Sequence, residues 1–197
     1  MDRERLKKQL DFILEIDKEK NILRQTHITG HKRQENDAEH AWHMAIMVYL
    51  LKEYSNRDFD VAKAMMMTLI HDVVEIDAGD TYAYCEEGTK DQKEREAKAA
   101  ERIFGILPLE QCETLRALFE EFEEGESAEA QFVRAMDNLQ PFLLNDANNG
   151  ADWISHAVRK SQVMERQIRT KKGSEKLWEI TRELIEKNAQ KGNLIDE

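Results

Sequence analysis

One run of residues narrows the possible folds of this chain more than any other. It extends from Val61 to Val74, is almost wholly apolar, and carries the adjacent pair His71 and Asp72 near its end. A run without a polar face predicts a helix buried in the middle of a protein. Ionisable side chains are costly in such a place unless they have partners. A metal ion suits a neutral imidazole beside a carboxylate, so the run predicts a buried metal site.

The size and composition of the chain indicate a helical protein. Its 197 residues are enough for one domain with a real core, because a chain of this length can bury roughly 70% of its unfolded surface. Helix breakers are few, with 2 prolines and 8 glycines, while good helix formers such as Ala, Leu, Glu and Lys dominate. We therefore predict an all-α fold in a single domain, residues 1–197.

Apolar periodicity places helices along most of the chain. We expect an amphipathic helix over 2–20 at the domain edge, and a mostly buried helix from a capping box at Asn36 and Glu39 to about residue 54. Their apolar stripes are Leu6, Leu10, Ile13 and Leu14, and Trp42, Ile46, Tyr49 and Leu50. The central helix is expected to end at about Glu75. Further helices are expected over about 91–105, 108–123, 127–145, 151–170 and 174–187.

Charge and cysteine content restrict the partners and the compartment. The net charge of −11 argues against duplex nucleic acid, because such binding requires basic residues that neutralise phosphates. Cys85 and Cys112 are too few for a disulfide framework, and we expect reduced thiols in a cytoplasmic protein. No apolar stretch approaches the ~20 residues that span a bilayer, and no signal peptide is evident. We therefore expect no membrane partner.

Four residues are candidate metal ligands: His40, His71, Asp72 and Asp137. Long gaps between ligands suit a site inside a helical bundle, where each facing helix contributes a side chain. Two imidazoles and two carboxylates favour one divalent ion of Mn, Co, Fe, Zn or Mg. A six-coordinate ion would keep two positions for water and a phosphate oxygen.

Two further carboxylates could serve catalysis. Glu75 follows His71 by four residues on the same predicted helix face, and Asp80 follows the bend at Gly79. Carboxylates beside a metal can position water and relay a proton to a leaving oxygen. The simpler alternative, hydrogen-bonded core residues, stays open for His40 and Asp137 taken singly. His43, one turn after His40, is interpreted as a core residue or a neighbour of the site.

The segment 21–36 is polar, irregular and long for a loop between helices. It carries a local basic excess made of Arg24, His27, His31, Lys32 and Arg33. Two interpretations have equal weight: a loop that faces a phosphate group, and a solvated loop.

Three segments in order resemble the HD-domain metal phosphohydrolases, in the branch that includes the bacterial 5′-deoxynucleotidases. They are residues 35–40 (ENDAEH), 71–80 (HDVVEIDAGD) and 127–137 (SAEAQFVRAMD). The resemblance implies an HD-type helical bundle with a core over about 20–145 and packing helices over 151–190, and a homodimer. It implies that His40, His71, Asp72 and Asp137 bind the metal and that Glu75 and Asp80 are catalytic.

The resemblance also bears on the substrate. An Arg-Trp pair before the first histidine reads phosphate and deoxyribose in the enzymes that this chain resembles. Arg24 is the nearest counterpart of that arginine, Arg33 is a second candidate, and Gln25 or Thr26 stands in place of the tryptophan. Family members with two metals have extra histidines between the third and last ligands. The chain has none between Asp72 and Asp137, so we expect one metal and monoester hydrolysis.

The resulting hypothesis is a divalent-metal-dependent phosphohydrolase acting on nucleoside or deoxynucleoside 5′-monophosphates. An HD hydrolase of another phosphoester, such as a guanosine polyphosphate or a phosphorylated metabolite, is the first alternative. A non-catalytic helical binding module stabilised by its metal is the second. Intact carboxylates at Glu75 and Asp80 count against the second alternative, because a structural metal needs neither.

Overall fold

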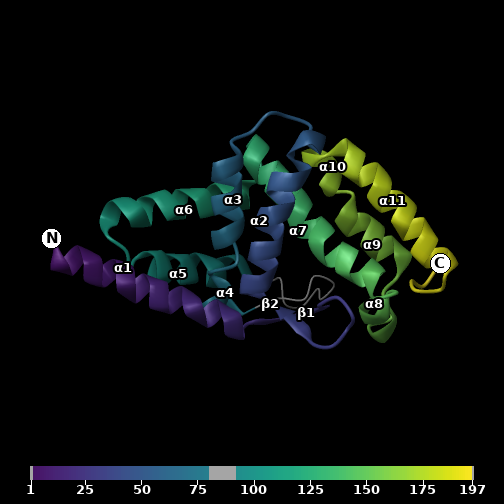
Figure 1. Ribbon diagram of the computed structural model, residues 1–197, viewed down its shortest axis with the longest axis horizontal. Helices are drawn as coiled ribbons and strands as arrows, with labels where there is room; N and C mark the ends of the chain where they lie inside the picture. The colour runs from purple at the N-terminus through teal and green to yellow at the C-terminus, as the bar shows by residue number, and fades with distance from the viewer. Residues whose placement is uncertain (1, 80–91, 197) are drawn as a thin grey trace.

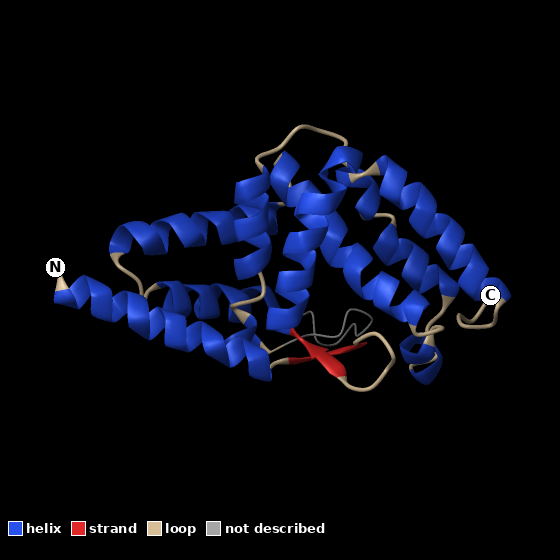
Figure 2. Cartoon of the chain, viewed as in Figure 1, coloured by secondary structure: helices blue, strands red, loops and turns tan. Residues whose placement is uncertain are grey.

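The computed structural model describes residues 2–79 and 92–196, and most of them are helical (Figure 2). The all-α prediction is confirmed, apart from one two-stranded antiparallel ribbon. In the part of the chain that the structure describes, the α-helices are α1 (Arg3–Ile16), α2 (Asp37–Leu51), α3 (Val61–Ile70), α4 (Glu75–Ala78), α5 (Gln92–Phe104), α6 (Leu109–Glu124), α7 (Ala128–Ala147), α8 (Ala151–Ser155), α9 (Lys160–Gln167), α10 (Thr170–Gly173) and α11 (Glu175–Gln190). The 3-10 helices are η1 (Asp17–Asn21) and η2 (Lys52–Tyr54), and the strands are β1 (Leu23–His27) and β2 (Gln34–Asn36).

Helix α7 lies in the middle of the molecule and contacts α2, α3, α6 and α10 (Figure 1). It begins as the sequence predicts, with the Ser127 side chain accepting a hydrogen bond from the Ala130 N–H. Phe132 and Met136 of this helix are wholly buried and belong to one apolar cluster with Met44 of α2 and Met67 of α3. This cluster fixes the relative positions of the three helices that later supply the candidate ligands.

A second apolar cluster holds α1, α5 and α6 together. Phe12, Phe104 and Phe119 contribute one aromatic ring from each helix, and Val73 joins them from the turn after α3. Figure 1 shows these three helices extending to one side with the N-terminus, while α9 and α11 lie on the other side near the C-terminus. The turn after α3 therefore lies where the two clusters meet.

The central helix is shorter than predicted. We expected it to continue to about Glu75, but α3 ends at Ile70 and His71 is its C-cap. The N–H of Glu75 bonds the carbonyl of Asp72 at 2.8 Å, three residues back, so a tight turn separates α3 from α4. Apolar periodicity cannot predict this break, because Val73 and Val74 are buried in the turn as they would be in a helix.

The apolar stripes of the first two helices are not their buried faces. Trp42 is 63% exposed and Leu50 is 61% exposed, and α2 instead buries the face that carries His40, Met44 and Val48. On α1, Leu14 is 71% exposed. Both faces of α2 are apolar, so periodicity alone cannot choose between them, and the prediction that the stripe from Trp42 to Leu50 is buried was wrong.

Two other segments differ from prediction. The segment 21–36 forms the β1–β2 hairpin, whose turn has Gly30 and His31 at positive φ. The segment 151–170 breaks into α8, α9 and the start of α10, and Ala157 at φ 51° marks the break between the first two. None of the helices among residues 2–79 and 92–196 is both long and apolar enough to cross a membrane.

Candidate metal centre

The structure brings His40, His71 and Asp72 together within 4.8 Å, and Asp137 contacts this group through His40. His40 lies in the first turn of α2, His71 and Asp72 follow α3, and Asp137 lies near the middle of α7. His40 Nε2 is 3.3 Å from Asp137 Oδ1 and 4.0 Å from Asp72 Oδ2. His71 Nε2 is 3.1 Å from Asp72 Oδ1. Both imidazoles are buried, and their centroids are 5.7 Å apart.

The second nitrogen of each imidazole is held by an acceptor. His40 Nδ1 lies 2.8 Å from Gln140 Oε1, and His71 Nδ1 lies 2.8 Å from the carbonyl oxygen of Thr68. Each Nδ1 therefore donates, which leaves each Nε2 facing the carboxylates, where it can bind a metal when it carries no proton. His71 Nε2 is buried, and among the described residues no acceptor meets it in hydrogen-bond geometry, although Asp72 Oδ1 lies 3.1 Å away. Two nitrogen and two oxygen donors of this kind fit a divalent metal.

Charge within the cluster is balanced by a buried guanidinium. Arg24 Nη1 donates to Asp72 Oδ2 at 2.9 Å and to Asp37 Oδ1 at 3.1 Å. Burial alone would lower the pKa of Arg24, but the carboxylates of Asp72 and Asp37 raise it above its usual value. The predicted phosphate ligand thus lies directly beside a candidate metal ligand.

The pKa values of the candidate ligands are shifted from their usual values. Burial acts to lower the pKa of His71, but the neighbouring Asp72 carboxylate outweighs burial and the pKa rises to about 9. Burial lowers the pKa of His40, and Arg24 lowers it further. For Asp137, burial favours the protonated form, but the His40 hydrogen bond holds the pKa below its usual range. A metal must displace the His71 proton, so its affinity should rise with pH.

Of the two predicted catalytic carboxylates, only Glu75 lies within the described residues. Glu75 is the first residue of α4, is buried, and lines the same cavity as His71 and Asp72. Asp80 lies outside the described residues. Arg33, the second predicted phosphate ligand, is exposed, pairs with Glu39 at 2.6 Å and is not among the residues that line this cavity.

A cavity of about 720 Å³ opens onto the candidate ligands. A pocket of this size suits a small molecule such as a nucleotide. Gln25 and Thr26 line it beside Arg24, and His71, Asp72 and Asp137 form part of its wall. Four basic residues from α7, α9, the turn after α9, and α10 also line it: Arg134, Arg166, Arg169 and Lys172. The cavity can therefore hold an anionic group against the ligands.

Sequence reasoning missed three buried residues that support the site. Gln140 binds His40 through Oε1 and donates from Nε2 to Glu35 Oε1 at 2.7 Å. Asp37 accepts from Arg24. The signal was available in part, because Gln140 follows Asp137 by three residues and therefore shares its helix face. Gln140 also approaches His43 Nδ1 at 3.1 Å, so His43 contacts this support rather than the four ligands.

Comparisons with known proteins agree with this geometry. Residues 16–178 match the family model described as the HD domain. A solved structure titled a predicted metal-dependent phosphohydrolase, from Magnetospirillum magnetotacticum MS-1, superposes with a TM-score of 0.92 at 45% identity, covering 96% of this chain and 95% of that one. A conserved hypothetical protein from Pyrococcus furiosus superposes with a TM-score of 0.64 at 25% identity, covering 92% and 99%.

Curated relatives match a shorter part of the chain. The 5′-deoxynucleotidase HDDC2 of Homo sapiens is 30% identical over 113 residues, which are 57% of this chain and 53% of the human protein. The 5′-deoxynucleotidase hdd1 of Schizosaccharomyces pombe is 28% identical over 116 residues, 56% of this chain and 57% of that protein. The chain thus spans about half the length of the curated relatives it matches. The match over residues 16–178, together with the arrangement of the ligands, establishes that this chain belongs to the HD-domain family.

Proposed function

We propose that this protein is a divalent-metal-dependent phosphohydrolase that releases phosphate from nucleoside 5′-monophosphates, deoxynucleotides included. The observation that carries the proposal is that His71, Asp72 and Asp137 lie on the wall of a cavity that also carries basic residues, with the buried His40 directly behind them. The names of the curated relatives and of the Magnetospirillum structure support the same reaction class.

The four ligands would hold one metal ion, which supplies polarisation of the phosphate and an activated water. Arg24 is the guanidinium nearest the ligands and would hold a phosphate oxygen through its N–H donors. Glu75, on the same wall, would carry a proton to or from the reacting oxygens. Asp80 is proposed as the second carboxylate of this proton transfer.

We expect the protein to discriminate only weakly between ribose and deoxyribose. Gln25 and Thr26 line the cavity next to Arg24, where the enzymes that this chain resembles carry a tryptophan. An amide and a hydroxyl can bond a ribose 2′-OH, whereas a large ring can exclude it. We therefore expect ribonucleotides and deoxynucleotides to be hydrolysed at rates within about tenfold of each other, a difference of about 1.4 kcal/mol.

A substrate panel tests this proposal. Metal-stripped protein is supplied with Co²⁺, Mn²⁺, Mg²⁺ or Zn²⁺, and phosphate release is measured from all nucleoside and deoxynucleoside monophosphates, sugar phosphates and a guanosine polyphosphate. The expected result is metal-dependent release from both nucleotide sets. Release from deoxynucleotides alone would show that another residue selects the sugar. Release only from sugar phosphates or the polyphosphate would refute the nucleotide assignment.

We also propose that the protein is a homodimer. The observation in support is the exposed apolar stripe of α2, which contains Trp42, Ile46, Tyr49 and Leu50. Met66 and Leu69 of α3, which packs against α2, are also exposed, at 44% and 43%. Contiguous exposed apolar surface of this kind marks protein interfaces.

A further inference from the structure

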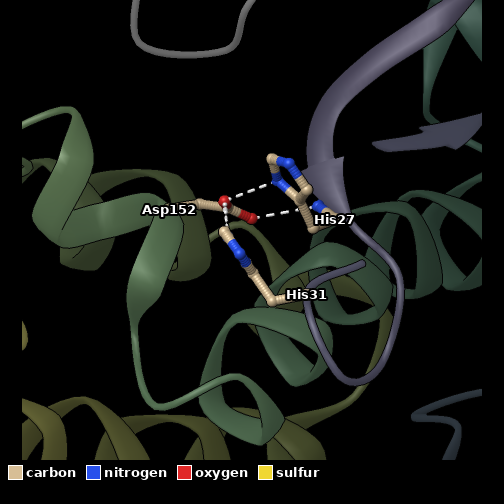
Figure 3. Close-up of side chains that lie close together, drawn as sticks. All are labelled: His27, His31 and Asp152. Atoms are coloured by element: carbon tan, nitrogen blue, oxygen red, sulfur yellow. Dashed lines mark hydrogen bonds and ion pairs between the residues drawn. The ribbon is translucent and has the colours of Figure 1, made fainter. Parts of the chain in front are cut away.

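A second cluster of metal-type donors shares no residue with the four candidate ligands, and Figure 3 shows its three side chains close together. It consists of His27 at the end of β1, His31 in the hairpin turn and Asp152 in α8. Asp152 Oδ1 lies 2.7 Å from His27 Nδ1 and 2.8 Å from His31 Nε2. The two imidazole rings are stacked with their centroids 4.0 Å apart. Both rings therefore present a nitrogen to the same carboxylate oxygen.

We propose that His27, His31 and Asp152 form a binding site for a divalent transition-metal ion. Two histidines and one carboxylate are a ligand set that binds Zn²⁺ and Fe²⁺ in proteins and leaves positions open for water or a substrate oxygen. One donor atom from each residue lies within 4.8 Å of the other two. This proposal does not depend on which phosphoester is hydrolysed.

The distances require little rearrangement to admit an ion. Ligand atoms held about 2.0–2.2 Å from a tetrahedral metal are separated from one another by roughly 3.3 Å. The present donor separations of 2.7 and 2.8 Å belong to hydrogen bonds, in which a proton lies between nitrogen and oxygen. When a cation binds, the proton of each facing nitrogen moves to the other ring nitrogen or is released to water. Each pair then opens by about half an ångström, which small side-chain rotations supply.

The carboxylate is buried and already oriented. The side chain of Asp152 is 7% exposed, and its second oxygen accepts a hydrogen bond from the backbone N–H of His27 at 3.0 Å. A carboxylate fixed in this way presents its other oxygen to the imidazoles with little freedom to turn. Hydrogen bonds of this kind orient metal ligands and strengthen binding.

The turn that carries the histidines is also held in place. The Asn148 side chain accepts from the N–H of Gly30 at 2.9 Å and donates to the carbonyls of His27 and Ile28. His31 takes a left-handed conformation at φ 55°, which is uncommon for a residue other than glycine. Residues other than glycine that are held in this conformation often lie at binding sites. The two imidazoles are thus positioned before any ion arrives.

The location links this site to the candidate active site. Asp152 lines the same cavity as Asp72 and Asp137. A cation there would add positive charge to the cavity wall. It could attract a part of an anionic substrate that the four candidate HD ligands and their metal do not hold. The expectation of a single metal rested on the stretch between Asp72 and Asp137, and the histidines of this site lie before that stretch.

Counting bound ions tests the proposal. Metal-stripped protein is dialysed against Zn²⁺, and the bound metal is measured by plasma mass spectrometry. We expect two ions per chain for the wild type, one for His31→Ala, one for Asp72→Ala, and none for the double variant. His156→Ala serves as the matched control, because it removes another exposed histidine near α8 and should leave two ions.

A second measurement locates the ion. In the Asp72→Ala variant, Zn²⁺ should shift the imidazole NMR signals of His27 and His31, and His31→Gln should abolish the shift of His27. Circular dichroism of each variant checks that the fold is kept, as expected for His31, which is exposed. One ion per chain in the wild type, or a second ion that persists in His31→Ala, would overturn the proposal.

Discussion

Glu35, Gln140 and His40 form a buried polar chain behind the candidate metal centre. Glu35 Oε1 accepts from Gln140 Nε2 at 2.7 Å, and His40 Nδ1 lies 2.8 Å from Gln140 Oε1. Burial raises the pKa of Glu35 to about 7, although Arg24 and the Gln140 hydrogen bond act against this rise. Glu35 is therefore a group that binds a proton more tightly in the folded protein than in the unfolded chain.

The pH dependence of stability should report this group. Its pKa rises from 4.5 in the unfolded chain to about 7 in the fold, so its contribution is fully present below the unfolded value and is lost as pH rises through the folded value. Glu35→Gln keeps the acceptor for Gln140 and removes the charge. Relative to wild type, the metal-stripped variant should gain up to about 3 kcal/mol in unfolding free energy at about pH 8, and little at about pH 5.

Denaturant unfolding at several pH values measures this gain, with Glu39→Gln as the control. Arg33 lowers the pKa of Glu39, so that substitution should give the opposite pH trend. A stability difference for Glu35→Gln that does not change with pH would contradict the account.

For individual residues, the sequence predicts the candidate metal ligands better than it predicts the buried residues near them. His40, His71, Asp72 and Asp137 are predicted as ligands because metal donors on apolar helices are costly without a partner. Glu35 and Asp37 gave no such signal, because their burial depends on how β2 and the start of α2 pack against α7 and Arg24. Their roles follow from tertiary contacts that periodicity does not contain.

Helix α2 shows what apolar patterning leaves undecided. Its buried face carries His40, Met44 and Val48, while its opposite face exposes Trp42 and Leu50. A soluble monomer buries one face of such a helix, so a second apolar face indicates a partner surface. Apolar patterning also fails to predict the turn at 71–74, because buried apolar residues do not show where a helix ends.

The proposed dimer gives a prediction for this element. Leu50→Glu places a charge on the exposed stripe of α2 and should shift the protein from dimer to monomer, because an unpaired charge in an apolar interface is costly. Sedimentation equilibrium measures the change. Leu109→Glu is the matched control at an exposed leucine of α6 and should leave the mass unchanged. A monomeric wild type, or a dimeric Leu50→Glu variant, would exclude this interface.

The cavity is a property of the whole molecule, because its wall draws on segments from the hairpin to α10. The C-terminal segment 151–190, expected only to pack, contributes Arg166, Arg169 and Lys172 to that wall. The expected helix over 151–170 is broken in the structure, and this break allows α9 to approach Asp137 closely enough for Arg166 to lower its pKa. The three segments that resemble the HD family predict the candidate centre. The basic wall depends instead on how the short helices after residue 150 pack against α7, which those segments do not contain.

The most direct test of the metal-dependent mechanism measures phosphate release from a deoxynucleoside monophosphate while Co²⁺ is added back to metal-stripped protein. The account predicts no release without metal and a rate that rises with occupancy of the HD centre. Asp72→Ala should lower the rate at least about 10³-fold, because it removes a proposed ligand of that centre and the partner of Arg24. Wild-type rates in the stripped protein, or in Asp72→Ala with its fold intact, would contradict the central claim that the HD ligands hold the catalytic metal.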